Sequence, residues 1–280
     1  MPRKKRQLHS DFPHHITARA HGRIAIPVNP ETAWEIFSDY LFLLNRGYGI
    51  QIHAFMMMPN HIHLIARDPN CVLSEAMNTF MRDTSKEMGR LSGDVDGIWG
   101  SRFHSSLITH SAYYLHAYRY LYQNPMRAKM AADVFAYRYS SINVLTGRLK
   151  GIIPIEEDHT LFEHLEGTVD WLNTLPPTDV IERVRNALQR KEFKFARCPK
   201  TKRGYDPSLD ESIASMTRLG PKSELVPYRP VPMIFSMSEI SFGQSLVRMS
   251  TPLDVTTTSS SMRTPIPRSS SGADMSSNGI

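Results

Sequence analysis

The stretch GIQIHAFMMMPNHIHLIARD, residues 49–68, decides the fold. It contains two runs of mostly apolar residues, separated by the turn pair Pro59-Asn60. This pattern predicts a β-hairpin. Side chains alternate between the two faces of a strand, so the histidines of HIHL would point to one face and the apolar residues to the other. Ile62 and Leu64 would then anchor the second strand in the core.

Two helices are expected on either side of this hairpin in the sequence. Residues 30–47 begin with a proline and carry apolar residues three and four positions apart, and we expect this helix to end at Gly47. Residues 72–91 repeat the same spacing and stop before Gly93. The two segments therefore predict amphipathic helices that pack on the hairpin.

The outer segments complete the order of elements. Residues 14–23 (HHITARAHGR) and 98–108 (IWGSRFHSSLI) have strand character, and residues 111–130 predict a helix with Ser111 as N-cap that runs until Pro125. The resulting β-α-β-β-α-β-α order predicts an α+β fold: a ferredoxin-like, RRM-like antiparallel sheet with helices on one face. In that topology the HIHLIA strand lies centrally.

The rest of the chain is expected to be an extension of this domain. Residues 160–175 and 177–193 look helical, whereas residues 251–280 contain no aromatic residue and little apolar periodicity. We therefore expect a domain in residues 1–150, a mostly helical extension in residues 151–220, and a low-complexity, disordered tail in residues 221–280.

Composition favours an anionic partner and a cytoplasmic location. The formal net charge is +6 and the sequence pI is about 9.3, and nucleic acid is the commonest partner of basic proteins. The cysteines Cys71 and Cys198 lie far apart without CxxC spacing, so neither a disulfide scaffold nor a cysteine zinc site is expected. No stretch of about 18 apolar residues predicts a membrane span.

The histidine pair allows two interpretations. His61 and His63 on one sheet face could share a divalent ion if another element supplies a third ligand, or they could simply face solvent. Tyr120 and Asn124 in YLYQNP lie four residues apart, so they are neighbours on one helical face. An amide ligand beside a tyrosine suggests a phenolate nucleophile next to a metal, although several tyrosines of this segment must be packing residues.

Three segments together carry a family resemblance. MPNHIHLI (58–65), IWGSRFHSSLI (98–108) and YLYQNPMRAKM (120–130) resemble, in order and approximate spacing, the single-tyrosine transposases of the HUH endonuclease superfamily. The similar group is the insertion-sequence-200-like and REP-associated one. The resemblance covers roughly residues 8–145, so it identifies the expected domain of residues 1–150 as a transposase catalytic domain.

The resemblance implies a DNA-processing chemistry. Tyr120 would attack a phosphodiester of single-stranded DNA, forming a 5′-phosphotyrosine and a free 3′-hydroxyl. His61, His63 and Asn124 would bind the metal, and an amide oxygen with two imidazoles leaves positions suited to Mg²⁺ or Mn²⁺. The DNA would carry a hairpin. Relatives are monomers or homodimers, and this choice stays open.

Basic residues are candidates for DNA contacts. Phosphate contacts are expected from Arg102, His104 and Arg127, although these three could instead be solvated cations near an exposed edge. Contacts to the DNA backbone are expected from Arg19 and Arg23. Two other functions remain open: a relaxase-like or replication-initiator-like nickase, and a domesticated protein that binds DNA hairpins without cutting.

Overall fold

A computed structural model describes residues 8–93, 97–156 and 165–195. The chain divides into two compact units, Met1–Arg229 and Pro230–Ile280, and every described residue belongs to the first. The tail expected in residues 221–280 lies outside the described residues. The boundaries at residues 150 and 220 stay predictions.

Four strands form one sheet in the order β2-β3-β1-β4. Every neighbouring pair is antiparallel, and β3 is an interior strand, as the sequence predicted. This is the ferredoxin-like arrangement, so the predicted α+β fold class is confirmed. The strands are β1 (Pro13–Arg19), β2 (Gln51–Met58), β3 (His61–Arg67) and β4 (His104–Leu107).

The hairpin of β2 and β3 turns at Pro59-Asn60, as predicted. The turn is held by backbone hydrogen bonds from the segment that follows β1. The Ala20 amide donates to the Asn60 carbonyl at 2.9 Å, and the Ile26 amide donates to the Pro59 carbonyl at 2.8 Å. These two bonds fix the position of the turn and so of the start of β3.

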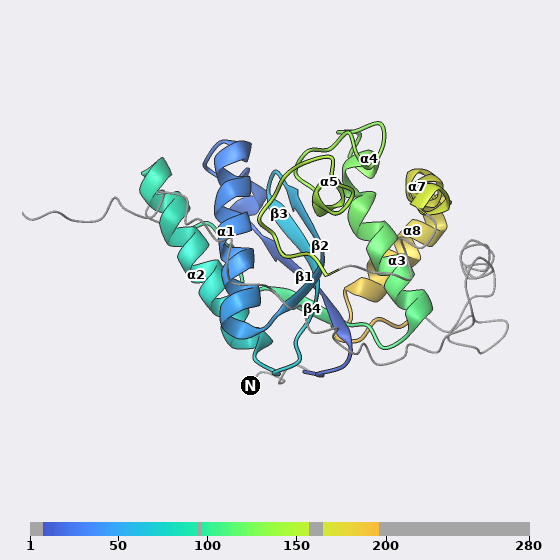
Figure 1. The fold of residues 1–280 in the computed structure, drawn as a ribbon, viewed down its shortest axis with the longest axis horizontal. Helices are drawn as coiled ribbons and strands as arrows, with labels where there is room; N and C mark the ends of the chain where they lie inside the picture. The colour runs from blue at the N-terminus through green and yellow to red at the C-terminus, as the bar shows by residue number, and fades with distance from the viewer. Residues whose placement is uncertain (1–7, 94–96, 157–164, 196–280) are drawn as a thin grey trace, which may run out of the picture. The chain divides into compact units, whose positions relative to one another are not determined.

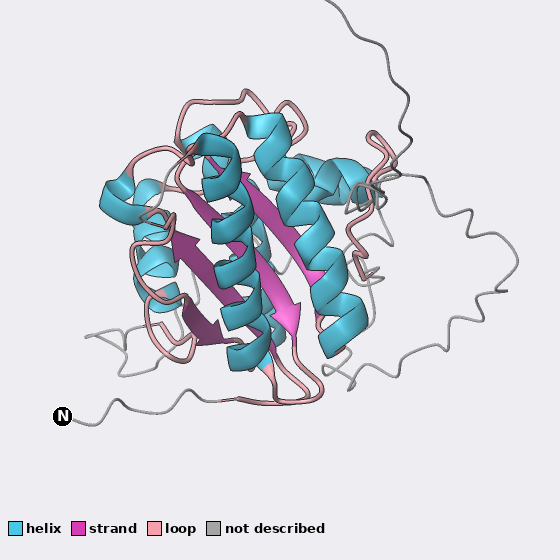
Figure 2. Cartoon of the chain, turned by 90° about the vertical axis from the view of Figure 1, so that its left-hand side faces the viewer, coloured by secondary structure: helices cyan, strands magenta, loops and turns pink. Residues whose placement is uncertain are grey.

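Helices α1 (Pro30–Tyr48) and α2 (Leu73–Ser92) pack against each other and against one face of the sheet (Figure 1). Figure 2 shows helices of this layer in front of the strands. The Asn29 side chain caps α1 by accepting from the Thr32 amide. α1 ends beyond the predicted Gly47, because Gly49 adopts the left-handed conformation (φ 71°) that terminates helices.

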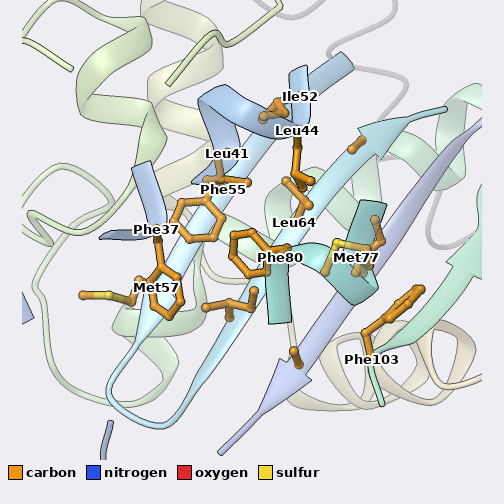
Figure 3. Packing of buried hydrophobic residues seen from close by; sticks show 14 of the residues in the cluster. Phe37, Leu41, Leu44, Ile52, Phe55, Met57, Leu64, Met77, Phe80 and Phe103 are labelled. Atoms are coloured by element: carbon orange, nitrogen blue, oxygen red, sulfur yellow. The ribbon is translucent and has the colours of Figure 1, made fainter. Parts of the chain in front are cut away.

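Large apolar side chains fill the space between this helix layer and the sheet (Figure 3). Burying one such side chain stabilises the fold by about 1.5–3 kcal/mol. Because they come from α1, α2 and the two strands of the hairpin, they fix the orientation of β3. The fully buried members include Phe37, Leu41, Phe55, Leu64 and Phe80.

The other face of the sheet is covered by α3 (Ser111–Tyr122), which differs from the prediction at both ends. Its N-cap is His110 instead of Ser111, because the His110 ring accepts from the Ala112 amide. The helix ends at Tyr122, and Pro125 lies in the first turn of the short α4 (Asn124–Arg127). A proline at the start of a helix costs nothing, since its nitrogen would have no intrahelical acceptor.

Helices of the C-terminal extension share the hydrophobic cluster under α3. The predicted helices appear as α7 (Leu165–Asn173) and α8 (Thr178–Leu188). The short α5 (Ser141–Leu145), which precedes the extension, lies against β2. Helices thus lie on both faces of the sheet and not on one as the sequence predicted: α1 and α2 cover one face, α3 and the extension the other (Figure 1). No helix in the described ranges combines the length and apolar character of a membrane span. The cluster includes Tyr118, Tyr122, Trp171, Val184 and Phe193.

Candidate active site

His61 and His63 lie on the sheet face that α3 covers. Their ring centroids are 4.9 Å apart, while Ile62 and Leu64 pack in the cluster of the opposite face. The alternation predicted from the sequence is therefore correct. The two imidazoles are not on a solvent-facing strand surface, because His63 is only 6% exposed and His61 is half-buried.

The turn residue Asn60 fixes the ring of His61. Its amide nitrogen donates to the Arg23 carbonyl at 2.7 Å, so its oxygen faces His61 Nδ1, also at 2.7 Å. An amide oxygen only accepts, and therefore His61 Nδ1 carries the proton. The lone pair of His61 Nε2 remains for another partner. Metal-binding histidines are usually held in this way, through the ring nitrogen that does not bind the metal.

His63 has a second histidine as its partner. Its Nδ1 lies 3.0 Å from Nε2 of His15 on β1. Its Nε2 is buried and makes no hydrogen bond within the described part of the chain. Buried polar atoms are nearly always hydrogen-bonded, so an unpartnered one calls for an explanation, such as an ion. This orphaned nitrogen fits a metal ligand.

Burial keeps both imidazoles neutral. It lowers the pKa of His61 to about 4, with a smaller contribution from Arg19. Burial also lowers the pKa of His63 well below its ordinary value, with smaller contributions from His15 and His61. Metals bind the neutral imidazole, so the pair is ready to bind a cation at neutral pH.

Tyr120 is the tyrosine of α3 that faces the histidines. Its ring centroid lies 6.1 Å from that of His63 and 6.4 Å from that of His15. Tyr118 and Tyr122 are fully buried and pack on each other at 4.8 Å in the cluster below the helix. These two are packing residues, whereas Tyr120 is half-buried.

Arg127 joins Tyr120 to Asn124. Its guanidinium lies over the Tyr120 ring at 4.0 Å, and one of its nitrogens donates to the Tyr120 carbonyl at 3.0 Å and to Asn124 Oδ1 at 2.7 Å. A guanidinium over an aromatic ring makes a cation–π contact, which holds the two side chains together. Arg127 is thus a neighbour of the tyrosine and not an exposed surface cation.

The Asn124 amide points to its own helix in this structure. Its oxygen accepts from Arg127, and its nitrogen donates to the carbonyls of Tyr120 and Leu121, both at 3.2 Å. No hydrogen bond connects Asn124 to either histidine among the described residues. These residues also contain no group of three or more His, Cys, Asp or Glu side chains that could hold a metal ion. Metal binding by Asn124 stays a prediction, and it requires the oxygen to leave Arg127.

The predicted DNA-contacting residues lie in different surroundings. Arg19 is exposed at the end of β1, directly opposite His61 in the strand register. Arg23 is exposed in η1 (His21–Arg23), next to Asn60. Arg102 is exposed before β4. His104 is half-buried, and its Nε2 lies 3.0 Å from the Leu188 carbonyl at the end of α8.

Sequence reasoning missed His15 and Asn60. Asn60 was identified only as a turn residue, and its contact with the neighbouring ring depends on the clamp to Arg23. His15 lies on an interior strand, and alternation along HHITAR was available as a signal. Its contact with His63 nevertheless depends on the β1-β3 register, which no local pattern specifies.

Comparisons with known proteins give fold similarities only. No protein-family model and no curated protein sequence matches the chain. The structure of a REP-associated tyrosine transposase bound to a REP hairpin is similar over 56% of this chain and 93% of that chain, with 20% identity and a TM-score of 0.45. A candidate transposase from Deinococcus radiodurans R1 is similar over 46% of this chain and 92% of its own, with 16% identity and a TM-score of 0.30. At these values neither similarity identifies an activity.

Proposed function

We propose that the protein is a single-tyrosine transposase that cleaves and rejoins single-stranded DNA, with Tyr120 as the nucleophile. One observation carries the proposal. The Tyr120 ring is next to two groups: its centroid lies 6.1 Å from that of the buried His63 imidazole and 4.0 Å from the Arg127 guanidinium carbon. A phenol next to a neutral imidazole that could bind a metal, and next to a cation, is suited to attack a phosphodiester. The order of motifs in the sequence points to the same chemistry.

The side chains present fit a divalent cation. His61 and His63 are neutral, each is anchored through Nδ1, and His63 Nε2 has no hydrogen bond among the described residues. Asn124 is the proposed third ligand. Mg²⁺ or Mn²⁺ bound there would act as a Lewis acid that polarises the scissile phosphate.

Arg127 has the clearest role among the chain's own groups near the nucleophile. Burial lowers the pKa of this guanidinium, and Tyr120 counteracts the effect, yet arginine remains protonated in proteins at neutral pH. Its positive charge lies beside the position where the scissile phosphate would bind, and it suits contact with that phosphate. The interior position of β3 holds the histidines while α3 holds the tyrosine, so the reacting groups come from two rigid elements.

The proposed reaction conserves the number of phosphoester bonds. The Tyr120 oxygen forms a bond to phosphorus and the bond to the 3′ oxygen breaks, which gives a 5′-phosphotyrosine and a 3′-hydroxyl. Attack by another 3′-hydroxyl on the phosphotyrosine rejoins the strand and returns the phenol. Because each step exchanges one phosphoester for another, neither ATP nor a redox cofactor is needed.

Exposed arginines near the histidines suit a DNA partner. Arg19 and Arg23 flank His61 and its anchor Asn60, and Arg102 is exposed before β4. Such residues bind phosphates and give affinity and position with little sequence choice. We propose that they hold the DNA backbone beside a hairpin.

A covalent adduct tests the proposal. The full chain is incubated with end-labelled, hairpin-containing single-stranded DNA from around its own gene and Mn²⁺, then separated under denaturing conditions. Wild type and a Tyr113→Phe control should form the adduct, because Tyr113 packs at the other end of α3 against Phe193. Tyr120→Phe should form none. An adduct that persists in Tyr120→Phe contradicts the choice of nucleophile, and binding without any adduct in wild type favours a protein that only binds hairpins.

A further inference from the structure

His15 is a buried histidine with no role in the motifs discussed so far. It lies in the middle of β1, is only 2% exposed, and stacks on His63 with ring centroids 5.2 Å apart and an angle of 29° between the planes. Its Nε2 faces His63 Nδ1 at 3.0 Å. A buried polar side chain aimed at a proposed metal ligand has the geometry of a group that orients that ligand.

The hydrogen bond between the two histidines allows two proton arrangements. In one, His63 Nδ1–H donates to His15 Nε2, which leaves the lone pair on His63 Nε2. In the other, His15 Nε2–H donates to His63 Nδ1, and His63 Nε2 then carries a proton. Only the first arrangement leaves His63 able to bind a cation.

The neighbours of the pair favour the first arrangement. Each arrangement leaves one buried N–H to be satisfied, because neither His63 Nε2 nor His15 Nδ1 has a hydrogen-bond partner among the described residues. In the first arrangement this N–H belongs to His15 Nδ1. Ser106 on β4 lies directly opposite His15 in the register, and its buried hydroxyl also has no partner within the described ranges. A rotation of the Ser106 side chain would supply the acceptor, and buried N–H groups rarely stay without one.

We propose that His15 is a positioning residue that holds His63 in the Nδ1–H tautomer and so keeps His63 Nε2 open for a cation. It does for His63 what Asn60 does for His61, from a different strand. The cation-binding consequence rests on the proposed function, whereas the tautomer is a property of the metal-free protein.

The tautomer can be measured directly. The full chain with ¹⁵N-labelled histidines is studied by NMR without metal at neutral pH, with the His63 signals assigned from a His63→Gln variant. Wild type should have the proton on His63 Nδ1. His15→Phe keeps the ring and removes the acceptor, so His63 should shift toward the Nε2–H form that free histidine prefers. His15→Gln places an amide oxygen at a similar reach and should restore the wild-type tautomer.

Mn²⁺ titration gives the second readout. Loss of such an outer ligand partner weakens metal binding by about 10–100-fold, so His15→Phe should show a loss of this size and His15→Gln a smaller one. His14→Phe is the matched control, because His14 is equally buried on the same strand and lies on the opposite face. His14→Phe should have the same His63 tautomer and the same Mn²⁺ affinity as the wild type.

Two results would overturn the proposal. One is a proton on His63 Nε2 in the wild type, and the other is a tautomer and Mn²⁺ affinity unchanged in a folded His15→Phe protein. If His15→Phe fails to fold, the His63 tautomer measured in the wild type and in His15→Gln still tests the proposal. Failure of the proposed function has a different signature: the Tyr120 adduct would be missing while the tautomer and Mn²⁺ binding follow the expected pattern.

Discussion

The two histidines of HIHL are each held through Nδ1 by a side chain from outside their own strand. Asn60 holds one ring from the hairpin turn, and His15 holds the other from the neighbouring strand. With Nδ1 occupied in both rings, Nε2 is the atom of His61 and of His63 that remains for the proposed metal. At the residue scale, the proposed metal site therefore depends on these two anchors as well as on the histidines.

Removing the Asn60 anchor should weaken metal binding without unfolding the protein. In Asn60→Ala, His61 loses the acceptor that fixes its tautomer, and we expect Mn²⁺ affinity to fall about 10–100-fold by calorimetric titration. Asn70→Ala is the control, since Asn70 also donates to a backbone carbonyl, that of Tyr48 at the end of α1, away from the histidines. Equal Mn²⁺ affinity in Asn60→Ala and wild type would contradict the role of Asn60.

Sequence alone identified the residues of the candidate site better than their orientations. His61, His63 and Tyr120 gather as expected, because strand alternation and a helical face are local regularities. The orientation of Asn124 was not predictable, since Arg127 three residues later competes for its oxygen. Such competition depends on side-chain contacts that spacing does not reveal.

At the scale of the element, β3 both carries the histidines of the candidate site and packs in the hydrophobic core. On the face covered by α3 it carries His61 and His63. On the other face, Ile62 and Leu64 are fully buried against the α1 and α2 layer. Because a shift of one residue in register would exchange the two faces, the apolar pair also fixes where the imidazoles point.

Truncating this anchor should cost substantial stability. We expect Leu64→Ala to lower the free energy of unfolding by about 2–5 kcal/mol, from lost burial and the cavity left behind. Urea unfolding followed by circular dichroism measures the change. The matched control is Leu43→Ala on the outer side of α1, where the side chain is 44% exposed, and its effect should be much smaller. Similar losses in both variants would argue against the packing of β3 described above.

Element boundaries show where local reasoning stops. The hairpin was predictable because its turn residues and apolar runs are adjacent in sequence. The start of α3 was not, because His110 provides the cap although serine is the commoner choice. The end of α1 was also missed, because Gly49 and not Gly47 takes the left-handed conformation.

At the scale of the whole molecule, the described part of the extension completes the domain. Trp171, Val184 and Phe193 join Tyr118 and Tyr122 in the cluster that supports α3. The helix that carries Tyr120 therefore depends on packing from residues more than fifty positions later in the chain. Sequence patterns predicted these helices but could not say on which face of the sheet they pack.

Buried histidines should make this domain sensitive to acid, and His116 of α3 offers a clean test. Burial lowers its pKa to about 4, with a smaller contribution from Arg119. An unfolded histidine titrates near 6.5, so protonation favours the unfolded chain. The stabilisation is full above about pH 6.5 and is lost as the pH falls toward about 4.

Replacing His116 should therefore reduce the acid sensitivity. His116→Phe keeps an aromatic ring against Phe195, and its unfolding free energy should fall by about 2 kcal/mol less than that of wild type between pH 7 and pH 5. Urea unfolding at the two pH values provides the measurement, with His21→Gln as an exposed control. A parallel fall in wild type and His116→Phe would mean that His116 is not kept neutral by burial.

The most direct test of the proposed transposase chemistry is to locate the DNA-linked residue. After reaction with hairpin-containing single-stranded DNA and Mn²⁺, nuclease and trypsin treatment would release the peptide YLYQNPMR, residues 120–127. Fragmentation in a mass spectrometer separates Tyr120 from Tyr122. We predict a 5′-nucleotide phosphate on Tyr120 alone. A phosphotyrosine at Tyr122 or on another peptide, or no linkage with any substrate that binds, would contradict the account.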